Sequence, residues 1–132
     1  MVIVLDSSYA LALAFPDENP PRSRDQVLAQ PLIAPHIFPV EVANAALNSV
    51  RRRRYLPHDA ERICQVIEAL AVATELPPAV GPAFHLRMAL AHGLTAYDAM
   101  YLDLAQVRRS PLATCDAALA AAARRAGVEV LS

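Results

Sequence analysis

The sequence predicts an α/β protein in which a short parallel sheet lies between two layers of helices, a three-layer α/β/α arrangement. Short apolar runs alternate along the chain with longer stretches in which apolar residues recur at helical spacing. This alternation of strands and helices favours a parallel sheet that is covered on both faces. The chain has 132 residues, of which 55% are hydrophobic, so it is long enough to bury one core. We expect residues 1–132 to form a single domain.

The first half of the chain opens on an apolar run. Residues 2–5 are all apolar and no basic segment precedes them, which indicates a buried strand and not a signal peptide. A polar, proline-rich loop at 16–25 separates the first two helices. Pro39 is tolerated only in the first turn of a helix, so it marks a helix start. In chain order, we expect a strand at 2–5, a helix at 7–15, a short helix near Gln26, a strand at 32–34 and a helix at about 38–54.

The second half begins with the most clearly amphipathic helix, which Pro57 opens. Its apolar residues recur at i, i+3, i+4 and i+7, and charged residues occupy the opposite face. The expected apolar stripe is Ala60, Ile63, Cys64, Ile67, Leu70 and Ala71. The later elements are expected as a strand at 74–76, helices at 81–92 and 95–109, a strand at 112–114, a helix at 116–126 and a strand at 128–131. In the helix at 81–92, we expect Phe84, Met88 and Leu90 to be core residues.

Charge and cysteine content argue against several classes of function. All 12 basic residues are arginines, so no mechanism that needs a lysine is available. Haloacid-dehalogenase-like phosphatases and phospho-receiver domains also place an aspartate after the first strand, but both use a lysine near the phosphate. Cys64 and Cys115 have neither CxxC nor zinc-site spacing, and we expect reduced, near-core thiols in a cytoplasmic protein. No apolar run reaches the length of a membrane span.

Four acidic residues interrupt apolar stretches near expected helix starts: Asp6, Glu41, Asp98 and Asp116. Singly, each is explained as a helix cap or as an anion near the positive end of a helix dipole. Together they indicate a site, because the carboxyl ends of parallel strands and the helix starts that follow share one edge of the sheet. The parallel topology places Asp6, Glu41 and Asp116 at this edge. It does not place Asp98, because the helix that carries Asp98 follows another helix and not a strand. Clustered carboxylates repel one another unless a cation neutralises them, and an all-oxygen set suits Mg²⁺ or Mn²⁺.

The four acids lie in the segments VLDSSYALALAFPDE, APHIFPVEVANAALNSVRRRRY, LTAYDAMYLDLA and LATCDAALAAAARRAGVEVL. In this order the chain resembles PIN-domain ribonucleases, specifically the VapC toxins of bacterial toxin–antitoxin systems. The resemblance spans nearly the whole chain and implies that the four acids gather around one or two divalent ions. It adds Thr114 as a hydroxyl that supports the catalytic set, and Ser8 and Asn44 as polar residues beside the first two acids. The segment FPVEV departs from the family, in which an aromatic or basic residue is commoner before the glutamate.

The resemblance also implies a reaction and partners. A bound ion would lower the pKa of its water and supply a hydroxide near neutral pH, which hydrolyses RNA to a 5′-phosphate and a 3′-hydroxyl. The implied partners are RNA, a small antitoxin of the VapB type encoded separately, and a second copy of the chain in a homodimer. The helix that begins at Pro57 is one candidate dimer interface. Two alternatives stay open: a PIN nuclease of RNA processing without a toxin role, and a non-enzymatic interaction module in which all four acids are caps.

Arg51, Arg52, Arg53 and Arg54 form a basic run at the end of the helix that contains Glu41. A solvated helix end is the first interpretation, because the dipole favours cations there. Contact with RNA phosphates is the second. At 1.5 Å rise per residue, Arg54 lies roughly 20 Å from Glu41 along the axis, too far to reach the scissile phosphate. Tyr97, beside Asp98, is placed to stack on a base, but helix packing is its expected role.

Overall fold

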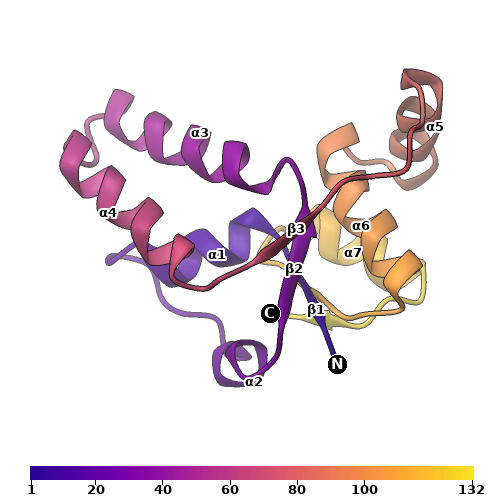
Figure 1. Cartoon of the computed structure of the whole chain (residues 1–132), viewed down its shortest axis with the longest axis horizontal. Coiled ribbons are helices and arrows are strands. Elements are labelled where there is room, and N and C mark those ends of the chain that lie inside the picture. The colour runs from indigo at the N-terminus through magenta and orange to yellow at the C-terminus, as the bar shows by residue number, and fades with distance from the viewer.

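A five-stranded sheet runs through the centre of the computed structural model, which describes residues 1–132 (Figure 1). All strand pairs are parallel, and β1 pairs with β2 on one side and with β4 on the other. The chain therefore changes direction across the sheet at β1, the kind of point where ligands bind at the carboxyl ends of strands. The strand order is β3-β2-β1-β4-β5, with β1 at Ile3–Leu5, β2 at Leu32–Pro35, β3 at Ala73–Glu75, β4 at Leu112–Ala113 and β5 at Val130–Leu131.

Helices form a layer on each side of the sheet. α1, α3 and α4 pack together in one layer, and α5, α6 and α7 lie on the other side (Figure 1). Their bounds are α1 Ser7–Ala14, α2 Arg24–Leu28, α3 Phe38–Arg51, α4 Pro57–Glu68, α5 Pro82–His92, α6 Ala96–Arg108 and α7 Ala117–Arg125. The expected three-layer α/β/α class with a short parallel sheet is confirmed, and every expected element is present, with ends shifted by a few residues. None of the helices combines the length and apolarity that crossing a membrane requires.

The hydrophobic core is centred on β1. Its three residues are apolar and 0% exposed, as expected for a central parallel strand that is covered on both faces. One cluster of 24 buried residues extends from this strand into both helical layers. The largest fully buried side chains are Tyr9 of α1 and Tyr101 of α6. Each is a phenol that needs a hydrogen-bond partner inside the protein.

Helix α3 ends at Arg51, three residues before the expected end at Arg54. The cause is local: Arg53 has a left-handed φ of 58°, which a continuing helix does not allow. Arg52 and Arg53 are exposed in the turn that follows, as is Arg51 at the helix end.

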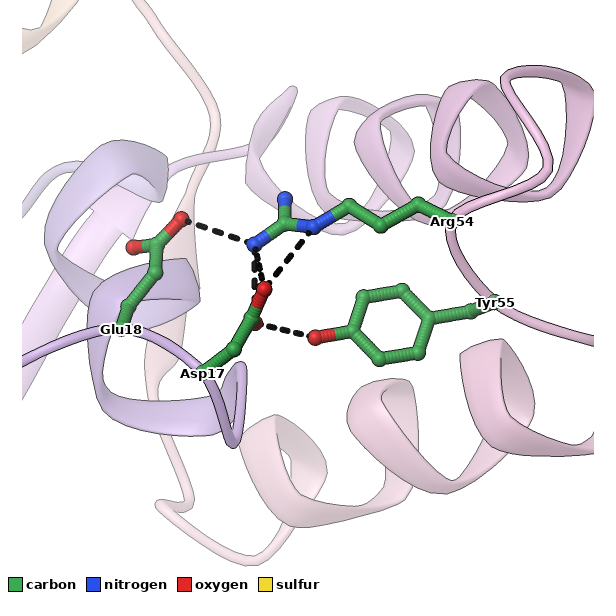
Figure 2. Close-up of polar contacts among 4 residues, drawn as sticks. All are labelled: Asp17, Glu18, Arg54 and Tyr55. Atoms are coloured by element: carbon green, nitrogen blue, oxygen red, sulfur yellow. Dashed lines mark hydrogen bonds and ion pairs between the residues drawn. The ribbon is translucent and has the colours of Figure 1, made fainter.

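Arg54 is already paired within the chain, as Figure 2 shows. Its Nη2 donates to Asp17 Oδ1 at 2.8 Å and lies 3.6 Å from Glu18 Oε1. The guanidinium is also 4.6 Å from the centroid of the Phe15 ring, and Tyr55 donates its hydroxyl to Asp17. Arg54 therefore joins the turn after α3 to the loop after α1, and it differs in this respect from the three arginines before it.

The amphipathic helix α4 packs its apolar face inside the protein. Ala60, Ile63 and Ile67 are buried, and the helix contacts α1 and α3. The expected stripe is too long at its end, because α4 stops at Glu68 and Ala71 is exposed with a left-handed φ of 54°. The buried face leaves few apolar side chains of α4 for a partner.

Helix α5 buries none of its residues. It packs mainly on α6 and lies at the outer edge of its layer (Figure 1). Leu90 is 73% exposed, so its expected place in the core is wrong, whereas Phe84 and Met88 are half-buried. Tyr97, at the start of α6, is 61% exposed and does not pack between helices as expected.

The two cysteines are unpaired, and they differ in exposure. Cys64 on α4 is half-buried, in line with the expected near-core position. Cys115 is exposed, because it lies in the loop between β4 and α7 and not in the strand itself, which corrects the expectation for this residue.

Candidate active site

The carboxyl edge of the sheet gathers three of the four acids through its topology. Asp6 directly follows β1, and its backbone amide donates to the carbonyl oxygen of Ala113 in β4 at 2.9 Å. Asp116 follows β4 at the start of α7, and Glu41 lies in the first turn of α3, which follows β2. The sheet reverses its order between β1 and β4, so Asp6 and Asp116 flank the switch point.

Asp6 is 3% exposed and is held by two hydroxyl groups. Ser8 Oγ donates to Asp6 Oδ2 at 2.5 Å, and Thr114 Oγ1 donates to the same oxygen at 2.8 Å. The hydroxyls are fixed in turn, because the Cys115 amide donates to Ser8 at 3.0 Å and the Asp116 amide donates to Thr114 at 3.0 Å. Both hydroxyl groups contact Oδ2, and no side chain donates to Oδ1. The structure thus brings Ser8 and Thr114 to the first acid.

The acids differ in how they serve the helices that they begin. Asp116 is a true N-cap, since its Oδ1 accepts a hydrogen bond from the Leu119 amide at 2.9 Å. Asp6 occupies the N-cap position of α1 but makes no side-chain cap bond. At α6 the cap is Thr95, which accepts from the Asp98 amide at 3.1 Å, so the Asp98 carboxylate itself is not the cap. Capping alone therefore does not account for Asp6 and Asp98.

Glu41 has a partner that the sequence did not indicate. Tyr101, which is 0% exposed, donates its hydroxyl to Glu41 Oε1 at 2.6 Å. Tyr101 lies three residues after Asp98 on α6, so both residues share one helix face. This helical spacing is the only signal in the sequence, and it gains meaning only once α6 is known to face the start of α3.

Electrostatic coupling links all four acids. The pKa values of Asp6, Glu41 and Asp98 are raised, and burial is the largest cause in each case. Like charge adds to this: Asp116 raises the pKa of Asp6, and Asp6 raises the pKa values of both Glu41 and Asp98. No arginine contributes to any of the three pKa values. The negative charges of these carboxylates are therefore not balanced by an arginine side chain of the same protein.

These residues fit a divalent cation. Their donor atoms are all oxygens, and buried or half-buried carboxylates that repel one another are the groups that a hard cation neutralises. No three acidic, histidine or cysteine side chains are spaced to ligate one ion by themselves. Mg²⁺ typically takes one or two carboxylates and fills its other positions with water and phosphate oxygens, so the arrangement suits this ion.

The raised pKa of Asp6 predicts a pH-dependent effect of Asp6→Asn in the absence of metal. A carboxyl group with a raised folded-state pKa stabilises the fold below its unfolded pKa, and this contribution is lost as pH rises through the folded pKa. The neutral asparagine carries no such penalty. We therefore expect Asp6→Asn to gain stability relative to the native chain as pH rises from about 4 to about 7, as measured by thermal denaturation in EDTA. Asp25→Asn, at an exposed aspartate of α2, is the control, and an equal pH trend in both variants would contradict the assignment.

The other residues expected at the site form no hydrogen bond with its four acids, although Asn44 lies one helical turn after Glu41. Asn44 is exposed on α3 and its side chain forms no hydrogen bond within the chain. The basic run lies at the opposite end of α3 from Glu41. Exposed apolar surface flanks the acids instead, with Val40 71% exposed beside Glu41 and Tyr97 beside Asp98.

The fold and the site define a small α/β/α domain whose sheet carries a carboxylate cluster at its switch point. The chain belongs to the PIN domain family, whose model matches residues 3–125. It is 33% identical over 115 residues to "VapC ribonuclease Mb0985" of Mycobacterium bovis and, equally, to "Ribonuclease VapC9" of Mycobacterium tuberculosis, covering 87% of this chain and 86% of each relative. The crystal structure of PAE2754 from Pyrobaculum aerophilum is similar, with a TM-score of 0.70 and 25% identity over 98% of this chain and 92% of that one. The family resemblance seen in the four sequence segments is confirmed.

Proposed function

We propose that this PIN-domain protein is a divalent-metal-dependent endoribonuclease that acts as the toxin of a toxin–antitoxin pair. The observation that carries the proposal is the cluster of buried Asp6 with half-buried Glu41, Asp98 and Asp116 at the sheet edge, in which the charges of Asp6, Asp98 and Asp116 raise the pKa values of neighbouring acids. Relatives named VapC ribonucleases, which match most of the chain, support the choice of RNA as substrate and the toxin role.

In the proposed mechanism, Asp6, Glu41, Asp98 and Asp116 would hold Mg²⁺ or Mn²⁺ together with water and phosphate oxygens, so that not every carboxylate would ligate the ion directly. The ion, when bound, supplies an activated water and offsets charge on the phosphate that is attacked. Thr114 and Ser8 fix Asp6 Oδ2, which leaves the orientation of that carboxylate set before any ligand arrives. Tyr101 does the same for Glu41 Oε1. Preset ligands lower the cost of ordering the site on binding.

A small antitoxin of the VapB type and a homodimer complete the proposal. The homodimer interface is better assigned to α5 than to α4. Helix α4 buries its apolar face within the chain, whereas no residue of α5 is buried. An antitoxin that covers the sheet edge would block RNA and would bring a cation, such as an arginine, to the acids.

An RNA-processing PIN nuclease without a toxin role is the alternative. Growth after controlled expression, with and without a co-expressed antitoxin, separates a toxin from an RNA-processing nuclease.

Cleavage of a defined RNA pool by the purified chain tests the proposal. We expect cleavage in Mg²⁺ or Mn²⁺, none in EDTA, and 5′-phosphate and 3′-hydroxyl ends on sequencing of the products. Cleavage that is equal with and without EDTA, or products with 2′,3′-cyclic phosphate ends, would contradict a metal-dependent hydrolysis.

The exposed arginines after α3 give a separate prediction about RNA affinity. Changing Arg52 and Arg53 to Gln should weaken RNA binding and flatten its salt dependence, by roughly 0.7 in slope for each phosphate of single-stranded RNA that is no longer neutralised. The cut position should not move, since this end of α3 is distant from Glu41. Fluorescence anisotropy at two salt concentrations measures the effect. The double change of Arg124 and Arg125 to Gln, at the end of α7, is the matched control. Equal slopes for the native chain and the Arg52/Arg53 variant would assign these arginines to a solvated helix end.

A further inference from the structure

Tyr101 links the two helical layers at the acidic cluster. Its side chain leaves α6 in one layer, and its hydroxyl reaches Glu41 on α3, 60 positions earlier in the chain. Asp98 stands one helical turn before Tyr101 on the same face of α6. A single bond therefore sets where the Glu41 carboxylate lies relative to the helix that carries Asp98.

The hydrogen bond from Tyr101 to Glu41 is charge-assisted, and it is the one side-chain hydrogen bond that the Glu41 carboxylate accepts. A length of 2.6 Å is typical of a hydroxyl that donates to an ionised carboxylate. No other side chain donates to either oxygen of Glu41, which is only half-buried and has a long, flexible side chain. Tyr101 is rigid by comparison, because it is 0% exposed and packed in the core. Its hydroxyl is thus the main fixed point for the Glu41 carboxylate.

We propose that Tyr101 is a positioning residue, which holds Glu41 Oε1 so that the other oxygen of this carboxylate faces the divalent cation. The inference rests on the proposed metal-dependent function. Tyr101 does not ligate the ion, and it acts only through Glu41. Outer-shell partners of this kind generally tune metal affinity by fixing the direction of a ligand.

The experiment compares Tyr101→Phe with a matched change at Tyr9. Both tyrosines are 0% exposed, and the hydroxyl of each bonds to a side chain of another element, which for Tyr9 is Ser23 at 2.8 Å. Tyr9→Phe therefore removes the hydrogen bond of another buried tyrosine hydroxyl, to a neutral partner outside the acidic cluster. Mn²⁺ affinity is measured by electron paramagnetic resonance, alongside melting temperature without metal and the Mn²⁺ dependence of RNA cleavage.

We expect Tyr101→Phe to weaken Mn²⁺ binding by roughly 10- to 100-fold and to raise the Mn²⁺ concentration for half-maximal cleavage by a similar factor. The KM for RNA at saturating Mn²⁺ should not change, and Tyr9→Phe should bind Mn²⁺ as the native chain does. In a Glu41→Gln background, Tyr101→Phe should add little, because the residue through which it acts is already altered.

Three results would overturn the inference. They are native Mn²⁺ affinity in Tyr101→Phe, an equal loss in Tyr9→Phe, and an undiminished effect of Tyr101→Phe in the Glu41→Gln background. If the native chain binds Mn²⁺ but cleaves no RNA, the proposed nuclease function is wrong. The positioning role of Tyr101 is still tested in that case, by comparing the Mn²⁺ affinities of the native chain and Tyr101→Phe.

Discussion

Asp116→Asn is expected to abolish RNA cleavage while leaving the fold nearly intact. Asparagine caps a helix as well as aspartate does, so the bond from the Leu119 amide to residue 116 should survive the change. The negative charge that acts on Asp6 and Asp98 is lost. We expect cleavage to fall by more than the roughly 100-fold that marks the upper range for loss of an outer-shell partner. Single-turnover cleavage and thermal denaturation of the same preparation measure the two effects.

Asp59→Asn is the matched control for this experiment. Asp59 also accepts a backbone hydrogen bond at the start of a helix, from the Leu56 amide to its Oδ2 at 3.2 Å, but it lies outside the acidic cluster. It should cleave RNA as the native chain does. Full cleavage by Asp116→Asn would show that residue 116 is a cap and no more.

Mg²⁺ or Mn²⁺ is expected to stabilise the native chain strongly. An ion that binds only the folded state at about 100 times its dissociation constant adds about 2.7 kcal/mol. For 132 residues this corresponds to a rise of roughly 10 °C in melting temperature. Asp98→Asn should reduce the rise, because Asp98 is coupled to both Asp6 and Asp116.

The control for the metal effect lies on the same helix. Asp103 is on α6 but is not among the charges that act on Asp6, Glu41 and Asp98, so Asp103→Asn should keep the full rise with metal. A melting temperature that is indifferent to both ions, or an undiminished rise in Asp98→Asn, would remove Asp98 from the metal site.

The parts of the site that depend on local pattern and on parallel topology are predictable from the sequence. Asp6 and Asp116 follow the ends of strands, and any parallel sheet brings such positions to one edge. Asp98 is not placed in this way, because its approach depends on how α6 packs on β1 and β2. The role of Tyr101 is hidden for the same reason, since a buried tyrosine on a helix is interpreted as core unless its partner is known.

The errors in the fold also have physical causes. A helical spacing of apolar residues does not say how much surface the neighbours offer, and α5 has mainly α6 to pack against, so Leu90 stays exposed. The expected end of α3 is too late because arginine favours helices, whereas Arg53 adopts the left-handed conformation.

The bond between Thr114 and Asp6 spans 108 positions of the chain, and it bears on how the protein is made. β1 is the first strand to be synthesised, but one of its two sheet neighbours, β4, is the fourth. A polypeptide that stops short of β4, through a nonsense codon or a stalled ribosome, leaves β1 with an open edge and its aspartate without Thr114 and Asp116. Fragments of this kind are expected to be inert as nucleases and prone to proteolysis. For an enzyme that would harm its own host, this arrangement ties activity to translation that has passed the fourth strand.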